Sequence, residues 1–251
     1  MSKKPIIGVI PDYVKDSTQS YSTRPHYCVR KNYLDMLTDA GALVVVIPYD
    51  YDSIDEYIGL IDGLMITGGF FDICPTRYSK EEKHPETLLN TVRENFEFEF
   101  VEKFLQTKLP FFGICNGMQV INCLYGGKII QHIPDEDGDY MIHEQSKVKG
   151  KEDSAIAYHD VLIEKDSLLH KIVGESHMVT NSSHHQAIRQ VGPGMKINSR
   201  AKDGIIEGIE DPNHPFCIGV QWHPEFNVSK GDKKIFEAFI NKTIEMKNEQ
   251  K

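Results

Sequence analysis

The sequence predicts an α/β fold in which a mostly parallel central sheet is flanked by helices and carries a small antiparallel extension. Short apolar runs alternate with segments of helical periodicity up to about residue 126, which is typical of parallel strands connected by helices. Beyond that point the chain becomes polar and rich in turns, and short strand-like segments follow one another. The length of 251 residues fits one large domain, which we expect to cover residues 1–251.

The first half of the chain predicts four strands, each followed by a helix. The segment 42–48 is β-branched and apolar throughout, so we expect a strand that is buried on both faces. Between residues 86 and 106 an apolar or aromatic residue recurs every four positions, which predicts a long helix. The expected strands are 6–10, 42–48, 63–67 and 109–114, and the expected helices are about 25–40, 53–60, 86–106 and 116–126.

The second half of the chain predicts the antiparallel extension. Residues 131–160 are polar and rich in turn residues, and we expect a long loop with short strands there. Three apolar segments separated by turn residues then predict strands at 195–201, 205–210 and 216–222. A final amphipathic stretch predicts a helix over about 229–247.

The composition argues against several classes of function. The net charge of −9 and the lack of a basic cluster argue against nucleic acid as a partner. No apolar run approaches the roughly 20 residues that span a bilayer, so we expect no membrane partner. The five cysteines are irregularly spaced without a CxxC pair, which favours reduced thiols in a cytoplasmic protein. The eleven histidines include no HxxxH spacing, so neither a metal nor another cofactor is expected.

One cysteine stands out because it lies between two glycines in "GICNG", residues 113–117. A strand-like segment precedes it and an amphipathic segment follows, which is the context of a nucleophile elbow. Such a turn would place the sulfur of Cys115 at a helix N-terminus, where a thiolate is favoured. The backbone N–H of Asn116 could then donate to an oxyanion. The alternative is that Cys115 is a small residue buried in a packed turn.

A cysteine nucleophile needs a base, and "QWHPEF" near the C-terminus offers one. His223 and Glu225 are two residues apart, so an extended segment would direct both side chains to the same face. Glu225 would then orient the imidazole of His223, as the third member of a catalytic triad does. The competing interpretation is a surface His-Pro-Glu turn without a catalytic role.

The two motifs together resemble those of the class I glutamine amidotransferase superfamily, G-x-C-x-G-x-Q and H-P-E. The segments "ITGGFFDICPTRY" and "TNSSHHQAI" are similar to one branch, the γ-glutamyl-γ-aminobutyrate hydrolase-like proteins, and the similarity spans nearly the whole chain. It implies a flavodoxin-like fold, no cofactor and a small γ-glutamyl substrate. Two features depart from the branch: Asn116 follows the nucleophile, and the "GGFFD" turn carries one extra aromatic residue.

The resemblance also implies a role for each matching residue. Cys115 would attack the γ-carbonyl of a γ-glutamyl group, His223 would act as base and then as acid, and Glu225 would orient His223. The backbone N–H groups of Gly69 and Asn116 would form the oxyanion hole. Two further residues are expected to contact the substrate: Gln119 at the glutamyl end and His184 in the pocket wall.

The expected activity is hydrolysis of a γ-glutamyl amide bond, with γ-glutamyl-γ-aminobutyrate from polyamine breakdown as the first candidate substrate. One alternative is a glutaminase subunit that delivers ammonia to a separate synthase. Another is a non-catalytic binding protein on the same fold. Proteins of this superfamily often associate as dimers, so a homodimer is a further expectation.

The other reactive side chains are expected to have structural or surface positions. In a strand, His185 would point away from its neighbour His184. The expected packing residues are Cys28, Cys74, Cys123, Cys217 and Trp222. The expected surface or loop residues are His143, His159, His170 and His177.

Overall fold

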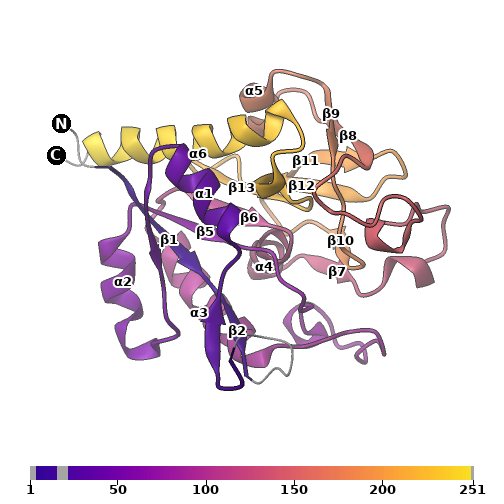
Figure 1. Ribbon diagram of the computed structural model, residues 1–251, viewed down its shortest axis with the longest axis horizontal. Coiled ribbons are helices and arrows are strands. Elements are labelled where there is room, and N and C mark those ends of the chain that lie inside the picture. Colours follow the sequence, from indigo (N-terminus) through magenta and orange to yellow (C-terminus); the bar gives the residue numbers. More distant parts are fainter. Residues whose placement is uncertain (1–3, 16–21, 250–251) are drawn as a thin grey trace.

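The computed structural model describes residues 4–15 and 22–249, and its centre is an eleven-stranded sheet (Figure 1). One half of this sheet is parallel, as the alternating sequence pattern predicts. Its strands, in spatial order, are β4 (Leu43–Val46), β1 (Ile6–Ile10), β5 (Gly63–Ile66), β6 (Phe111–Ile114) and β13 (Cys217–Val220). Because β6 and β13 are parallel neighbours, their carboxyl ends meet at the same edge of the sheet.

The other half of the sheet is antiparallel. Its strands follow β13 in the order β12 (Ile206–Glu210), β11 (Lys196–Ala201), β8 (His159–Ile163) and β9 (His177–Thr180). A side branch is formed by β10 (Ala187–Gln190), which pairs with both β12 and β7 (Lys128–Ile130). The predicted α/β fold with an antiparallel extension is confirmed, and the strands β7 to β10 enlarge the extension beyond the segments that the sequence indicated.

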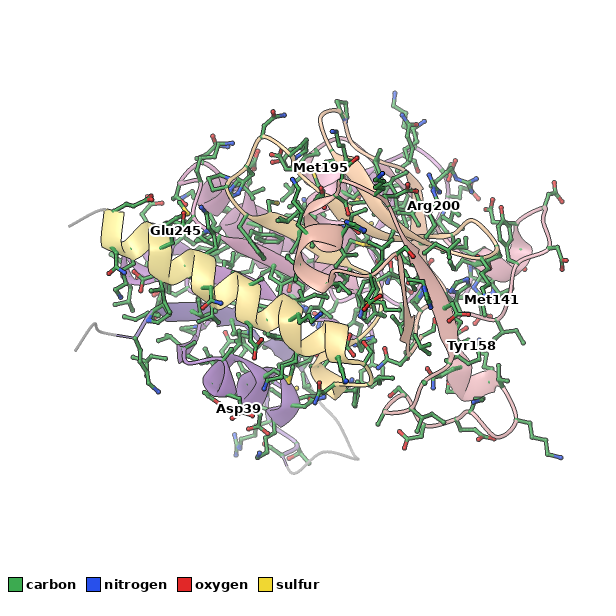
Figure 2. The ribbon with its side chains drawn as sticks, turned by 90° about the horizontal axis from the view of Figure 1, so that it is seen from above. Asp39, Met141, Tyr158, Met195, Arg200 and Glu245 are labelled. Atoms are coloured by element: carbon green, nitrogen blue, oxygen red, sulfur yellow. The ribbon has the colours of Figure 1, made fainter. Side chains whose placement is uncertain are left out.

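Helices cover both faces of the sheet and form a hydrophobic core on each. Phe111 and Phe112 of β6 point into different cores, as neighbouring residues of a strand buried on both faces must. Figure 2 shows α6 running along the parallel half, with Met141 and Tyr158 toward the opposite end of the molecule. None of the described helices has the long apolar stretch that a membrane span requires. One face carries α2 (Ile54–Leu60), α3 (Thr91–Leu105) and α4 (Asn116–Leu124), and the other carries α1 (Lys31–Asp39), α5 (Leu168–Val173) and α6 (Lys230–Glu249).

The strand expected at 42–48 is present as β4, but the prediction that it is buried on both faces is wrong. It lies at the edge of the sheet and pairs only with β1. Leu43 is 53% exposed and Val46 is 41% exposed. An apolar, β-branched composition favours a strand, but it does not reveal whether the strand has one neighbour or two.

Two predicted helices begin later than the apolar periodicity suggests. The helix expected from residue 25 begins at Lys31, because β3 (His26–Cys28) pairs instead with β2 (Asp12–Val14) in a separate hairpin. The helix expected from residue 86 begins at Thr91. Its start is fixed by Asn90, whose side chain accepts a hydrogen bond from the N–H of Arg93.

Candidate active site

Cys115 occupies a strained turn between β6 and α4. Its φ of 52° and ψ of −103° lie outside the regions that most residues adopt. A Cβ on Gly113 would lie 2.6 Å from the carbonyl carbon of Gly117, and a Cβ on Gly117 would lie 2.6 Å from the oxygen of Ile66. Both positions require glycine because the strand and the helix approach each other too closely for a side chain. Cys115 lines a cavity of about 200 Å³ at this turn.

His223 and Glu225 follow β13, the strand beside β6. Nδ1 of His223 lies 2.8 Å from Oε1 of Glu225, and both residues are buried. The prediction of an extended segment here is wrong, because Pro224–Phe226 form a single 3₁₀ turn. This turn nevertheless brings the side chains of His223 and Glu225 together. Asn181 fixes the backbone here: its Oδ1 accepts the N–H of His223 at 2.8 Å, and its Nδ2 donates to the His223 carbonyl at 2.9 Å.

The imidazole of His223 and the side chain of Cys115 are neighbours beside Gly68. A Cβ on Gly68 would lie 2.8 Å from Cε1 of His223 and 3.3 Å from Cβ of Cys115. Burial alone would lower the pKa of His223, but the charge of Glu225, followed by the charge and hydrogen bond of Cys115, raises it to about 10. His223 therefore carries a proton at neutral pH. Tyr33 supports this arrangement, because its Oη accepts the N–H of Gly68 at 3.1 Å and lies 3.4 Å from Nδ1 of His223.

Gly69 and Asn116, the expected oxyanion-hole residues, both line the cavity. Asn116 is the first residue of α4, so its N–H has no acceptor within the helix. Its side chain donates from Nδ2 to the carbonyl of Phe71 at 3.1 Å, which ties the Cys115 turn to the loop after β5. The extra aromatic residue in this loop, Phe70, is 76% exposed, and the guanidinium of Arg30 lies 5.1 Å from its ring centre.

Arg93 of α3 supports the loop after β5 from the interior. Its Nη2 donates to the carbonyl of Thr67 at 2.8 Å, and its Nη1 donates to the carbonyl of Gly68 at 3.2 Å. The buried guanidinium is balanced by Glu97 at 2.7 Å and by Asp12. Nothing in the sequence pattern singled out Arg93, because its partners outside α3 come from two distant segments of the chain.

A chain of hydrogen bonds through two glutamine side chains leads to the sulfur of Cys115. Gln221 donates from Nε2 to Sγ of Cys115 at 3.3 Å. Gln119 donates to Oε1 of Gln221 at 3.1 Å and to the carbonyl of Gln186 at 3.3 Å. Gln119 lines the cavity, and its amide nitrogen is occupied by these protein acceptors. Gln221 was not predicted, although it belongs to the same "QWHPEF" segment as His223.

His184 and His185 both line the cavity. Nδ1 of His184 lies 2.9 Å from the carbonyl of Gln186, and Nε2 lies 3.5 Å from Oε1 of Glu207. The expectation that His185 points away is wrong, because this segment lies between β9 and β10 and is not a strand. Nε2 of His185 lies 3.0 Å from Oδ1 of Asp72, which lines the same cavity.

Some of the remaining assignments are confirmed and others are wrong. Trp222 is fully buried and donates from Nε1 to Asp232 at 3.0 Å. Cys28 is exposed and Cys74 is half-buried, so neither is a core residue. Cys28 ends the short strand β3, which pairs only with β2 outside the main sheet, and Cys74 lies in an irregular segment after β5. The confirmed buried cysteines are Cys123 and Cys217, and the confirmed surface histidine is His177. His170 is half-buried in α5, His143 lies in a loop as expected but is buried, and His159 is buried in β8.

Comparison with known proteins finds relatives along nearly the whole chain. A family model described as Peptidase C26 matches residues 5–225. A glutamine amidotransferase-like protein of Rickettsia prowazekii is 35% identical over 96% of this chain and 98% of its own length. The similarly described protein YvdE of Lactococcus lactis is 33% identical over 86% of this chain and 89% of its own length. The gamma-glutamyl-gamma-aminobutyrate hydrolase PuuD of Escherichia coli is 26% identical over 94% of this chain and 92% of its own length.

A similar solved structure is that of a protein from Thermoplasma acidophilum described as one subunit of GMP synthase. It has a TM-score of 0.64 at 16% sequence identity, and the match covers 99% of this chain and 98% of that chain. At this identity the likeness concerns the fold, and it agrees with the mixed sheet described above. The region matched by the family model includes both the Cys115 turn and the His-Pro-Glu segment. The chain belongs to the Peptidase C26 family, among the glutamine amidotransferase-like proteins.

Proposed function

We propose that the protein hydrolyses a γ-glutamyl amide bond through a γ-glutamyl thioester on Cys115. The observation that carries this proposal is the buried pair of His223 and Glu225 beside a cysteine in a strained turn. A thiol, a histidine base and an orienting carboxylate are the groups that cysteine-dependent acyl transfer requires. Membership of a peptidase family supports hydrolysis as the reaction type.

In the first step, the sulfur of Cys115 attacks the γ-carbonyl carbon as a thiolate whose proton is held by His223. The carbonyl oxygen becomes an oxyanion, which the N–H groups of Gly69 and Asn116 stabilise. Collapse of this intermediate breaks the bond between the carbonyl carbon and the amide nitrogen. The raised pKa of His223 means that its proton is available to the departing amine.

In the second step, His223 is neutral and accepts a proton from water. The resulting hydroxide attacks the thioester, the carbon–sulfur bond breaks, and glutamate is released. Cys115 returns as a thiolate beside a protonated His223, so one water molecule is consumed in each cycle. Glu225 keeps Nδ1 of the imidazole occupied throughout, which leaves Nε2 to exchange protons with sulfur, amine and water.

The charges around the cavity are suited to a zwitterionic substrate. Arg30 and His185 line the cavity together with Asp72 and Glu144, so both signs of charge are present. γ-Glutamyl-γ-aminobutyrate carries one ammonium and two carboxylate groups, and it is the substrate in the name of the Escherichia coli relative. We therefore include this compound, and with it a role in polyamine breakdown, as the first substrate to be tested.

A glutaminase subunit that supplies ammonia to a separate synthase is the second candidate. The observation that favours it is that the relatives at 35% and 33% identity are described as glutamine amidotransferase-like. Such a protein would use the same nucleophile and base. Its distinguishing property would be release of glutamate from glutamine and not from the γ-glutamyl amide of γ-aminobutyrate.

The decisive experiment incubates the wild-type protein with each of these two substrates and measures free glutamate. Cys115→Ala should abolish release, whereas Cys28→Ser, which removes an exposed thiol outside the cavity, should not. Mass spectrometry of the acid-quenched reaction should detect a glutamyl adduct on the peptide that contains Cys115. Release of glutamate from glutamine alone would favour the glutaminase. Unchanged glutamate release by the Cys115→Ala variant would reject a cysteine mechanism. A protein inert toward both substrates, whose Cys115 also resists alkylation, would favour a binding role.

A further inference from the structure

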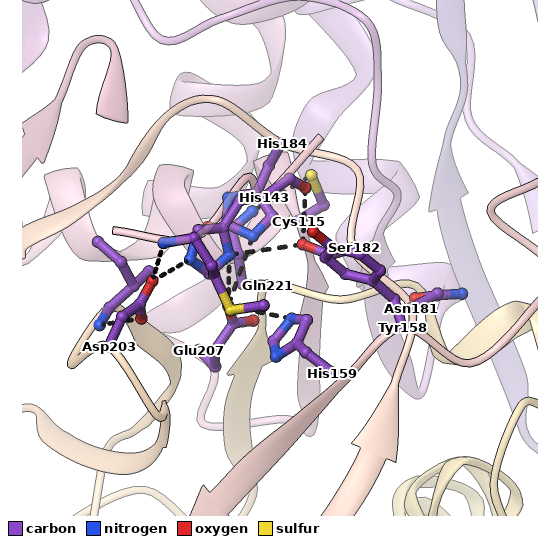
Figure 3. A network of polar contacts seen from close by, with 12 residues as sticks. Cys115, His143, Tyr158, His159, Asn181, Ser182, His184, Asp203, Glu207 and Gln221 are labelled. Carbon is purple, nitrogen blue, oxygen red and sulfur yellow. Dashed lines mark hydrogen bonds and ion pairs between the residues drawn. The ribbon is translucent and has the colours of Figure 1, made fainter. Parts of the chain in front are cut away.

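Three imidazole groups surround one carboxylate oxygen in the antiparallel part of the sheet (Figure 3). Oε1 of Glu207, on β12, lies 3.2 Å from Nδ1 of His143, 3.5 Å from Nε2 of His184 and 3.8 Å from Nε2 of His159. All four residues are at least nine-tenths buried. They come from the loop before β8, from β8 itself, from the segment between β9 and β10, and from β12.

Four of the five atoms at the centre of this cluster lack hydrogen bonds, and the fifth, Nδ1 of His143, lies 3.5 Å from Oγ of Ser182. Among the described residues, Nε2 of His159, Nε2 of His184 and both carboxylate oxygens of Glu207 are buried without a hydrogen-bond partner. The ring nitrogens lie near the carboxylate, yet none meets it with the geometry of a hydrogen bond. Buried polar atoms normally have hydrogen-bond partners. Four such atoms without a partner in one small cluster therefore indicate a missing partner that accepts lone pairs.

The other nitrogen of each imidazole ring has a hydrogen-bond acceptor. Nδ1 of His159 lies 3.1 Å from the carbonyl of Asp160, and Nδ1 of His184 lies 2.9 Å from the carbonyl of Gln186. Nε2 of His143 lies 2.9 Å from a carboxylate oxygen of Asp203. A ring N–H donated outward leaves the opposite nitrogen with a lone pair directed inward. Histidines that bind metals in proteins are oriented in this way.

The distances from the Glu207 oxygen to the three ring nitrogens suit a tetrahedral ion. Ligand bonds of about 2.0–2.1 Å separate neighbouring ligand atoms of a zinc tetrahedron by about 3.3–3.4 Å. The three distances to the Glu207 oxygen, 3.2, 3.5 and 3.8 Å, bracket this value. The ligand atoms of His143, His159 and Glu207 also lie within 4.8 Å of one another. His184 lies outside this group of three, so its ring must move inward to become the fourth ligand, whereas His143, His159 and Glu207 need smaller side-chain movements.

We infer that His143, His159, His184 and Glu207 form a binding site for one divalent metal ion of the zinc type. Imidazole and carboxylate ligands suit this ion, and its two charges balance the carboxylates of Glu207 and Asp203 around neutral imidazoles. Entry is provided by a second cavity of about 320 Å³, which is lined by His143 and His184.

The ion would have a structural role. It would join four segments of the chain, and through His184 it would fix one wall of the catalytic cavity. The backbone of Glu207 also accepts the N–H of Gln221, the residue that donates to the sulfur of Cys115. None of the four ligands takes part in the proposed hydrolysis steps, so this inference and the proposed function can fail independently.

Zinc binding is tested by calorimetric titration of metal-stripped protein with ZnCl₂, combined with elemental analysis of the washed complex. The titration is made in a Cys115→Ser background, because a thiolate beside His223 could itself bind zinc. We expect one zinc ion per chain, an increase in melting temperature on binding, and the intense visible absorption of tetrahedral cobalt when Co²⁺ replaces Zn²⁺.

The variants Glu207→Gln and His159→Gln should lose zinc binding, and His177→Gln provides the matched control. His177 is an exposed histidine on β9, the strand that pairs with β8, so its replacement should leave binding unchanged. Absence of stoichiometric zinc and of the cobalt spectrum in the folded Cys115→Ser protein would overturn the inference, whatever the variants do. That outcome would mean that protons balance the two carboxylates, with His143 protonated between them. Unaltered zinc binding by folded His159→Gln would also overturn it.

Discussion

Replacing Glu225 by Gln tests whether one carboxylate keeps His223 protonated. The rise in the pKa of His223 from 6.5 to about 10 corresponds to roughly 5 kcal/mol of net preference for the charged imidazole. Burial opposes this preference most strongly, so the charged partners together supply more than this amount, and Glu225 contributes most among them. Gln keeps the shape of the side chain and removes its charge, so the pKa of His223 should fall steeply.

The same substitution should reduce glutamate release at pH 7 by about 10⁴-fold, as the corresponding change in a serine protease triad does. The pKa is measured from the ring-proton resonance of His223 between pH 5 and 11, and the rate is measured with the free-glutamate assay. Glu152→Gln, which removes an exposed carboxylate outside the cavity, is the matched control. A folded Glu225→Gln protein in which His223 titrates as in the wild type would refute the reasoning.

Three further predictions concern stability. The pKa of His223 is about 10 in the folded protein and 6.5 in its ordinary, unfolded setting. The contribution of protonated His223 to the free energy of unfolding is therefore complete below about pH 6.5 and is lost as pH rises through 10. Urea midpoints should therefore fall between pH 7 and 10, and a constant midpoint would contradict this. Gly117→Ala should destabilise the protein by about 1–3 kcal/mol, because the new Cβ meets backbone at 2.6 Å. Gly59→Ala, in α2 with open space around it, should instead stabilise by about 0.5–1 kcal/mol, and equal urea midpoints for the two variants would reject the steric argument. Arg93→Met should cost about 3–5 kcal/mol in equilibrium unfolding, because it leaves Glu97 buried without its partner; a loss below about 1 kcal/mol would show that the pair is dispensable.

The parallel half of the fold could be predicted because its signals are local. Apolar runs and helical periodicity identify β1, β5, β6 and α4 closely, and the two glycines around Cys115 indicate the turn between them. Strand order is not local information. The exposure of β4 follows from its place at the edge of the sheet, and the hairpin of β2 and β3 replaces the first turns of an expected helix.

The candidate site shows the same division between local and long-range information. Cys115, His223 and Glu225 belong to two short motifs, and their residue types indicate the chemistry. The supporting residues have no such signal: Asn181 holds the backbone of His223 from a separate loop, and Arg93 holds the loop after β5 from inside α3. The buried histidine cluster likewise forms only through the pairing of antiparallel strands, which no sequence spacing reveals.

The insertion of β13 between β6 and β12 determines when the proposed active site can be assembled. The turn that holds Cys115 is synthesised first, and His223, the proposed base, lies more than a hundred residues later in the chain. Under the proposed mechanism, a nascent chain therefore carries the thiol without its base until residues up to 225 have been made and β13 has paired with β6. The proposed reactivity of Cys115 would thus depend on completed folding, and a chain that stalls or is cut before β13 would lack the proposed active site.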